Sequence, residues 1–295
     1  MSLSTTADFF VPELFVEAIQ GAFIGVKALY GTRAVIMSGT MPPDPEAGSG
    51  RHVRKIVNIP YFNSLGDFQI VPTDGDALDI RKISHSKEQA NVEHAGVSFS
   101  MTDWARMAAG GGDPYVEGAR QMAEGFTRAV DQCLITAALE SSQKIDVYSA
   151  TAPRKLDLQL MNQGLSQFAD EQQDELVLMV VHSVVLEELR NLVDSTGRPL
   201  LMNMVDGSLP RFMGVPVAAS NRITPAADAA IGKYTTAIFK PGSVVCWYDG
   251  VPVVETDRDI TVPTQIAAVH TWFAAHAYKR LPGRAKGGVV LLVHN

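Results

Sequence analysis

The chain has 295 residues, of which 46% are hydrophobic and 19% are charged, as in a folded globular protein with a substantial core. Acidic residues outnumber basic ones by 32 to 25, and the net charge of −7 argues against a protein that grips nucleic acid through phosphate contacts. Two cysteines are too few for a disulfide framework, and no run of about 20 apolar residues predicts a membrane-spanning helix.

The first 55 residues have the pattern of an arm and not of a core. Their start lacks the basic region and apolar stretch of a signal peptide, so we expect synthesis in the cytosol. A helix is predicted over residues 12–29, with a proline near its start. Prolines, glycines and small polar residues then fill residues 40–51, which predicts a loop or flexible arm.

A long hairpin is predicted in the next segment. Residues 52–62 have the pattern of a strand, and strand-like alternation recurs around residues 78–80 and 97–99. The very polar residues 81–93 between these two strands predict the tip of the hairpin. Because the strands have too few apolar residues to bury both faces, such a hairpin needs a partner surface. It is either an ordinary surface hairpin or one that lies on a neighbouring subunit.

The strongest helical signal begins at Asp113, a good N-cap followed by a proline at the first helical position, and ends at Glu140. At 100° per residue its apolar side chains fall in one stripe, and its charged side chains, with Asp131 among them, lie opposite. Gly118 and Gly125 are one heptad apart on an edge of the stripe. Each costs about 1 kcal/mol in a helix interior, so we expect another group to pack close to the backbone there.

The second half mixes strands and helices, which predicts an α/β layer within an α+β protein. Helices are predicted at residues 154–170 and from Ser183 onward. Strands are predicted at residues 175–181, 213–221, 234–239, 243–248, 251–255 and 287–295. An Asp-Gly pair at 249–250 predicts that two of these strands form a hairpin. Residues 264–281 fit either a helix or a long strand.

No motif for catalysis, cofactor binding or metal binding is present, so no such residue is predicted. His85, Glu88 and His94 have the residue types of metal ligands but match no known spacing. The acidic cluster at residues 74–79 has too few ligands for calcium and predicts a solvated turn. His182 follows a predicted buried strand, where a structural histidine is favoured over a catalytic one. Cys133 lies on the apolar stripe of the long helix and predicts a buried free thiol.

Four stretches, in their order along the chain, resemble a known family. SLGDFQIVPTDGDALDIRKIS with HAGVSFSMTDWA is similar to an extended loop and its return strand. DPYVEGARQMAEGFTRAVDQCLITAAL is similar to a spine helix, and LVLMVVHSVVLEELRNL and FMGVPVAASNRI are similar to parts of an axial domain. Together they resemble the major capsid proteins of tailed bacteriophages, which have the Hong Kong 97 fold.

The resemblance implies an α+β fold with four parts. They are an N-terminal arm (residues 1–55), a peripheral domain (56–64, 105–145 and 245–295), an extended loop (65–104) and an axial domain (146–244). It also implies that residues 264–281 are mainly strand. A protein of this family is not an enzyme and needs no cofactor; it assembles as pentamers and hexamers into an icosahedral head that encloses double-stranded DNA without sequence-specific binding.

The partners that the resemblance implies are further copies of the chain, a portal protein, and cement or decoration proteins, with no membrane involved. The chain lacks the charged helical scaffolding segment of some family members, so we expect a separate scaffolding protein or none. The family's founding member cross-links its subunits, but partners for Lys82 and Lys87 are not identifiable here, so we expect non-covalent assembly. The residues expected at contacts between subunits are Lys82, His85, Lys87, Glu88, Glu93, Gly118 and Gly125.

Two alternatives remain at this point. An encapsulin-type cellular compartment has the same shell fold but holds an enzyme cargo instead of DNA. An α/β enzyme that uses His182 with a nearby carboxylate belongs to a different class of protein.

Overall fold

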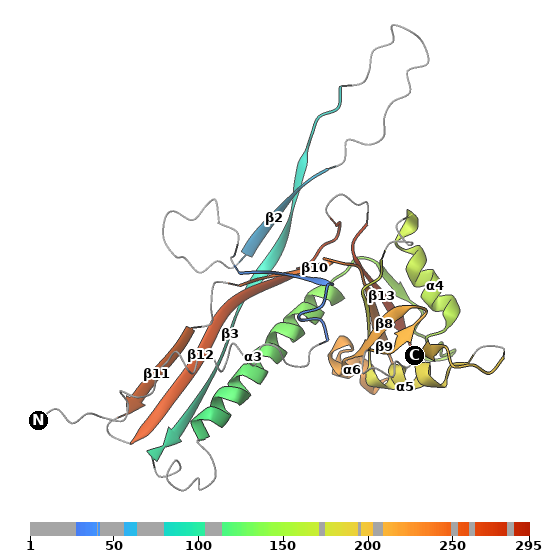
Figure 1. The fold of residues 1–295 in the computed structure, drawn as a ribbon. Coiled ribbons are helices and arrows are strands. Elements are labelled where there is room, and N and C mark those ends of the chain that lie inside the picture. The colour runs from blue at the N-terminus through green and yellow to red at the C-terminus, as the bar shows by residue number, and fades with distance from the viewer. Residues whose placement is uncertain are drawn as a thin grey trace, which may run out of the picture.

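The computed structural model describes residues 28–39, 41, 56–63, 80–103, 114–170, 175–193, 196–202, 209–248, 253–259, 263–281 and 286–295. They form a mixed α+β fold with two sheets and one long helix (Figure 1). Most of the predicted N-terminal arm and the acidic cluster at 74–79 lie outside the described residues.

Helix α3 (Pro114–Leu139) confirms the strongest prediction from sequence. Good helix formers fill it, and Arg120 and Arg128 each form an ion pair with Glu124 one turn away. Its buried hydrophobic side chains lie on one face, which packs against both sheets. They are Ala119, Met122, Ala123, Phe126, Val130, Leu134, Ile135, Ala137 and Ala138.

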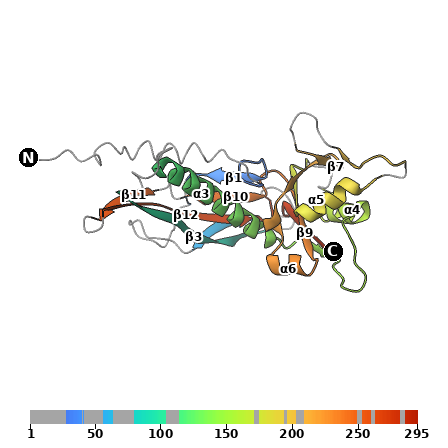
Figure 2. The same cartoon turned by 90° about the horizontal axis from the view of Figure 1, so that it is seen from below.

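The first sheet is elongated and has the strand order β1-β10-β12-β3-β2, with β11 also paired to β12. Its strands are β1 (Val35–Ser38), β2 (Ile56–Phe62), β3 (His85–Thr102), β10 (Val244–Tyr248), β11 (Val253–Asp259) and β12 (Thr264–Ala277). β12 shows that the ambiguous segment at 264–281 is a strand. Helix α3 lies along one face of this sheet (Figure 2), where its alanines and Met122 pack on Ala267 and Val269.

The predicted hairpin between β10 and β11 does not form in the described residues. Both strands instead pair antiparallel with β12. Strand β10 pairs with residues 273–277 of β12, and β11 pairs with residues 264–270. They therefore lie one after the other along β12. The prediction was wrong because β12, with 14 residues, offers an edge long enough for both strands, and residue pattern alone does not show which strand a run pairs with.

The predicted hairpin tip at residues 81–93 is also wrong in position. Residues 85–102 form one continuous strand of 18 residues, β3, which pairs with β2 over 85–91 and with β12 over 92–102. The polar character of residues 85–93 predicts a hairpin tip. In the structure it has another cause, because most side chains on both faces of β3 are exposed. The hairpin therefore consists of β2 and the first part of β3.

The second sheet has the order β4-β13-β9-β5-β8-β7-β6. Its strands are β4 (Lys144–Asp146), β5 (Leu178–Val181), β6 (Leu201–Met202), β7 (Arg211–Phe212), β8 (Val215–Ala219), β9 (Tyr234–Phe239) and β13 (Val289–His294). The strand predicted at 234–239 is confirmed with the same bounds, and those predicted at 175–181, 213–221 and 287–295 are confirmed with shorter bounds. Every side chain of β5 and β13 is buried, as their continuous apolar runs indicate.

Short helices accompany this second sheet: α4 (Leu158–Ser166), α5 (Ser183–Asn191), the 3-10 turn η3 (Asn221–Ile223) and α6 (Ala226–Ala230). Helix α4 is shorter than the predicted 154–170 because Asp157 caps its N-terminus, with Oδ1 accepting from the Leu160 N–H at 2.6 Å. Helix α6 forms in a stretch of small residues that carried no helical prediction.

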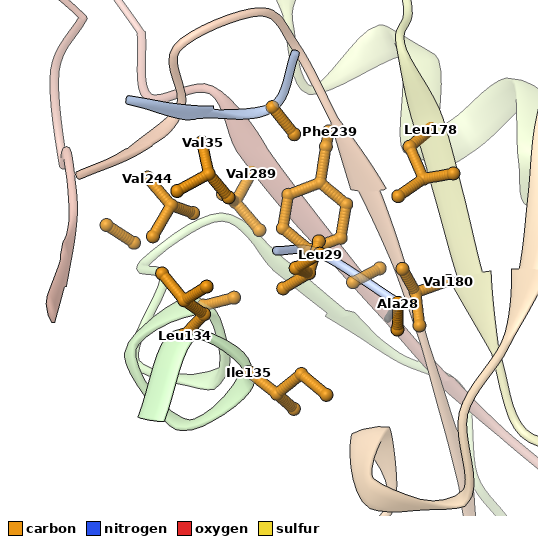
Figure 3. Close-up of a cluster of buried hydrophobic side chains, with 14 of the residues drawn as sticks. Ala28, Leu29, Val35, Leu134, Ile135, Leu178, Val180, Phe239, Val244 and Val289 are labelled. Atoms are coloured by element: carbon orange, nitrogen blue, oxygen red, sulfur yellow. The ribbon is translucent and has the colours of Figure 1, made fainter. Parts of the chain in front are cut away.

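One apolar core joins the two sheets to the long helix (Figure 3). Leu134 and Ile135 of α3 face side chains from β5, β9, β10 and β13. The labelled residues of these four strands are Leu178, Val180, Phe239, Val244 and Val289, and Val35 of β1 lies in the same cluster. Ala28 and Leu29 enter the same core. Because this cluster holds residues of both sheets, the two sheets form one body around the end of α3.

The hairpin extends beyond that body. Figure 1 shows β2 and the start of β3 projecting at one end of the first sheet, while β11 and the end of β3 lie at the other end. Both ends are remote from the second sheet and its helices. The chain therefore has two projecting ends that do not contribute to the shared core.

Candidate assembly surfaces

The root of the hairpin is fixed by a buried pair, Glu88 of β3 and His276 of β12. Glu88 Oε2 lies 2.5 Å from His276 Nε2 and also accepts a hydrogen bond from the Lys279 N–H at 3.3 Å. Both side chains are almost fully buried. Burial, together with the Glu88 carboxylate, raises the pKa of the neighbouring Tyr278. Since a buried carboxylate is costly unless it is paired, this contact holds β3 in place against β12.

An apolar cluster completes this root. It contains Val57 of β2, Ala90 of β3, Val245 and Trp247 of β10, and Ala274 of β12, all of them buried. Cross-strand neighbours share a sheet face, and Val245 is paired with His276, so the cluster lies on the same face as the buried pair. The base of the hairpin is thus packed within its own subunit.

The far end of the hairpin is different, because its apolar side chains are exposed. Ile80 is fully exposed, Phe62 is 78% exposed and Ile83 is 62% exposed. Lys82 lies among them, and Lys87 lies closer to the root, next to Glu88; both lysines are exposed and form no ion pair in the described part of the chain. Exposed apolar side chains grouped in this way mark a contact surface.

The structure places the predicted contact residues of the hairpin in different surroundings. Lys82, His85 and Lys87 are exposed near its end, as a contact with a neighbour requires. Glu88 is buried against His276, so it is engaged within its own subunit and is not retained as a contact residue. The Glu93 carboxylate hydrogen-bonds the Cys133 thiol of α3, which also ties it to its own chain.

The two glycines of α3 also differ. A Cβ added at Gly118 would lie 2.7 Å from the Phe99 ring of β3, so the expected close packing is present there and comes from the same chain. Among the residues that the structure describes, a Cβ added at Gly125 would meet nothing within 4 Å. Close packing of another subunit at Gly125 stays a prediction.

Asp131 was predicted on the charged side of the long helix, but it is buried. Its Oδ1 accepts hydrogen bonds from the Leu29 N–H at 2.9 Å and the Tyr30 N–H at 3.1 Å. In the sequence, the feature that indicates a buried acceptor is a single acidic residue, Asp131, next to a strongly apolar stretch of the helix. Asp131 thus fixes the part of the N-terminal arm that enters the core.

The two cysteines are unreactive thiols in this fold. Cys246 is buried in the shared core, where desolvation raises its pKa to about 12. Desolvation also raises the pKa of Cys133, with a further contribution from Glu93. Because the thiolate is the reactive form, neither residue has the surroundings of a nucleophile or redox centre.

His182 lines a pocket of about 450 Å³ together with Gln132, Asn221, Arg222 and Thr224. It caps helix α5, with Nδ1 accepting from the Val184 N–H at 3.3 Å, and burial lowers its pKa. Arg222 is occupied by the Arg128 carbonyl at 2.8 Å. The residues that line the pocket include no carboxylate, so the partner that a catalytic His182 would need is not among them.

His85, Glu88 and His94, which have the residue types of metal ligands, do not form a metal site. His94 stacks on Trp272, Glu88 pairs with His276, and His85 is exposed. Over the described ranges, no group of three or more His, Cys, Asp or Glu side chains is arranged to hold a metal ion. In the same residues, no helix is long and apolar enough to cross a membrane.

Residues 87–291 match the model of a family described as phage capsid protein, which is more than half of the chain. The chain therefore belongs to the phage capsid protein family. The predicted resemblance to the major capsid proteins of tailed bacteriophages is confirmed, and the chain is a structural protein of a virion shell. No curated protein sequence matches it.

Solved phage capsid structures share the fold. A chain of Mycobacterium phage Che8 has 15% identity and a TM-score of 0.57, covering 81% of this chain and 85% of its own. The capsid of Ralstonia phage GP4 has 12% identity and a TM-score of 0.63, covering 91% of both chains. The capsid of a native GTA particle computed with C5 symmetry has 11% identity and a TM-score of 0.62, covering 92% and 93%. At these identities the likeness concerns the fold.

Proposed function

We propose that this chain is the major subunit of an icosahedral phage head, which it builds as pentamers and hexamers around double-stranded DNA. The observation that carries the proposal is the hairpin. Its root is locked by Glu88 and His276, but its end exposes Phe62, Ile80 and Ile83. The hairpin is held at its base, and its end is apolar and exposed, so covering that end with another molecule removes apolar surface from water. In a shell that molecule is the next subunit.

The division into parts follows the Hong Kong 97 scheme with two changes of boundary. We assign residues 1–55 to the arm, 65–104 to the extended loop, and 56–64, 105–143 and 245–288 to the peripheral domain, so that the first sheet draws strands from all three parts. The axial domain is the second sheet with α4–α6, and it begins at β4. Since β13 lies between β4 and β9 in that sheet, we move residues 289–294 from the peripheral to the axial domain.

The contact residues that we retain on the surface are Lys82, His85, Lys87 and Gly125. The three hairpin residues are exposed, and no described residue lies within 4 Å of a Cβ added at Gly125. Glu93 and Gly118 are engaged with Cys133 and Phe99 of the same chain. Their part in assembly is therefore indirect: they hold β3 against α3.

The acidic balance of the chain fits DNA that is enclosed and later released, because a net charge of −7 does not favour tight phosphate contacts. We propose synthesis in the host cytoplasm, a separate scaffolding protein or none, a portal, and cement or decoration proteins, with non-covalent contacts between subunits.

The GTA neighbour, whose capsid was computed with C5 symmetry, supports fivefold assemblies of this fold. The match to phage capsid proteins favours a virion over a compartment with an enzyme cargo.

The test is sedimentation of the expressed full chain, with and without a scaffolding protein. We expect a fast-sedimenting particle fraction for the wild type and its loss in a Phe62→Ser/Ile83→Ser variant that keeps its thermal unfolding midpoint. Val193→Ser, which also changes an exposed apolar side chain but lies far from the hairpin, is the matched control. A wild-type chain that stays a small oligomer under all these conditions contradicts the proposal.

A further inference from the structure

The pocket beside His182 lies where two neighbouring strands of the second sheet end. Strands β5 and β8 run parallel, with Val181 paired to Ala219 at their last residues. His182 follows β5 directly, and Asn221 lies two residues after the end of β8. Because the carboxyl ends of parallel strands share one edge of a sheet, residues from both connections meet there. Ligands of open α/β sheets bind at such an edge.

Three further elements close the pocket around this edge. The residues that they contribute are Gln132 from α3, Arg222 from η3, and Ala226 and Ala229 from α6, with Thr224 and Pro225 between the last two elements. The volume of about 450 Å³ falls within the range of roughly 300–1,000 Å³ that is typical of small-molecule sites. The pocket therefore has room for a small organic group, and one subunit forms it.

Three polar side chains of the pocket have an acceptor atom occupied by backbone of the same chain. Asn221 Oδ1 and His182 Nδ1 accept from the first two N–H groups of helix α5, at 3.2 Å and 3.3 Å. Thr224 Oγ1 accepts from the Thr235 N–H at 3.0 Å. The groups that remain are the amide N–H groups of Asn221, the Nε2–H of His182 and the hydroxyl of Thr224. This side of the pocket is therefore rich in hydrogen-bond donors.

Arg222 adds a positive charge to these donors. Its guanidinium uses one N–H on the Arg128 carbonyl at 2.8 Å, and it forms no ion pair within the described ranges. Carboxylates on two of the surrounding helices have other partners. Asp131 of α3 is buried against backbone N–H groups, and Asp228 of α6 pairs with Lys233 at 3.7 Å. The remaining donors of the guanidinium are thus available to a negatively charged ligand.

We propose that this pocket binds a carboxylate, paired with Arg222 and hydrogen-bonded by Asn221 and His182. The two oxygens of a carboxylate fit the fork of a guanidinium, and its single charge balances that of Arg222. A phosphate group, with a charge of about −1.5 to −2, would keep an excess of negative charge there. Burial lowers the pKa of His182, so at neutral pH its ring supplies a donor and no second positive charge.

The apolar side of the pocket accommodates a short aliphatic chain next to the carboxylate. Pro225, Ala226 and Ala229 provide small apolar surface beside the donors. An acidic side chain of another protein molecule and a free small carboxylic acid both have this chemistry. Because a single subunit forms the pocket, the inference goes beyond the proposed shell function and does not depend on it.

Propionate, which has the carboxylate and the aliphatic chain of a glutamate side chain, is the probe. Saturation-transfer NMR on the full chain should show saturable binding of propionate, and none of propionamide, its uncharged counterpart of the same shape. Arg222→Gln should weaken the binding of propionate by about tenfold or more, because it removes the counter-ion. Arg190→Gln removes an exposed arginine of α5 that does not line the pocket, and it should bind like the wild type.

A second pair of variants leaves Arg222 in place. Ala226→Leu fills the pocket from α6 and should abolish binding, whereas Ala227→Leu, on the same helix but outside the pocket, should not. Both alanines are exposed, and thermal unfolding checks that each variant keeps its fold. No saturable binding of propionate to the wild type, or unchanged binding in Arg222→Gln and Ala226→Leu, would overturn the proposal. Equal binding of propionamide, or displacement of propionate by a lower concentration of inorganic phosphate, would overturn it too.

Assembled particles distinguish the two sources of the carboxylate. If an acidic side chain of a neighbouring subunit fills the pocket in particles, propionate binds to unassembled subunits only. If the ligand is a free acid, propionate binds to subunits and particles alike. Either result supports a carboxylate pocket. A wild type that binds propionate but never assembles would count against the shell function alone, since the titration needs only a folded subunit.

Discussion

Glu88 and His276 lie 188 residues apart in the chain, yet their side chains meet at 2.5 Å in the buried root of the hairpin. The contact sits where β3 stops pairing with β12 and starts pairing with β2. It therefore fixes the direction in which the hairpin leaves the body. In a shell, that direction decides which neighbour the hairpin reaches.

Glu88→Ala should destabilise the subunit and loosen the hairpin, because it leaves His276 buried without its partner. Removing one member of a buried pair costs about 3–5 kcal/mol. The check is the free energy of unfolding in denaturant, with amide exchange of β2 and β3 as a local measure. Glu140→Ala, at an exposed position, is the control. Unchanged stability and unchanged exchange in Glu88→Ala would show that the pair does not hold the hairpin.

Asp131→Ala should cost about 1–3 kcal/mol, because the buried N–H groups of Leu29 and Tyr30 lose their acceptor. Asp131→Asn keeps a side-chain oxygen and should cost clearly less. Denaturant unfolding of the two variants compares them, and amide exchange at Leu29 and Tyr30 reports the contact itself. Equal losses in both variants would mean that the charge of Asp131, and not its role as acceptor, matters.

The two glycines of α3 should respond in opposite ways. Gly118→Ala places a methyl group against the Phe99 ring and should lower thermal stability, whereas Gly125→Ala has open space and should raise it by up to about 1 kcal/mol. Gly125→Leu should leave the subunit folded but reduce the yield of particles, measured by sedimentation beside the unfolding curve. Particles of normal size and yield with Gly125→Leu would remove Gly125 from the proposed contacts.

Alkaline pH should destabilise the fold through the buried thiols. Burial raises the pKa of Cys246 from about 9 to about 12. Below pH 9 both states hold the proton and the stability is intact. Between pH 9 and 12 only the unfolded chain releases it, so the free energy of unfolding falls by about 1.4 kcal/mol per pH unit and thiol. Cys246→Ala should make this slope shallower; an identical slope would show that Cys246 is not the group responsible.

Much of the fold follows from local pattern. The cap and the apolar stripe predict α3 to within one residue at each end, and the continuous apolar runs predict β5 and β13, because a buried strand needs apolar residues on both faces. These elements are specified by residues near one another in sequence. The resemblance to phage capsid proteins rested on their order and is confirmed by the family match.

The contact surfaces were less predictable because they depend on pairing across the chain. Nothing around Glu88 in sequence shows that His276 will cover it, so a charged strand residue was taken for a surface contact. The pairing of β11 with β12 shows the same limit: Asp257 and Ile266 become neighbours only once the two strands pair in register. Pattern shows which faces are exposed, but the register between distant strands decides which side chains share them.

The central claim is that this chain builds a closed shell from ring-shaped units. Its most direct test is electron microscopy of the expressed full chain, co-expressed with its scaffolding protein where one is needed, and reconstructed without imposed symmetry. The account predicts closed particles tens of nanometres across, with fivefold and sixfold units and the end of each hairpin resting on the next copy. Only monomers or small oligomers at every concentration tested would contradict it.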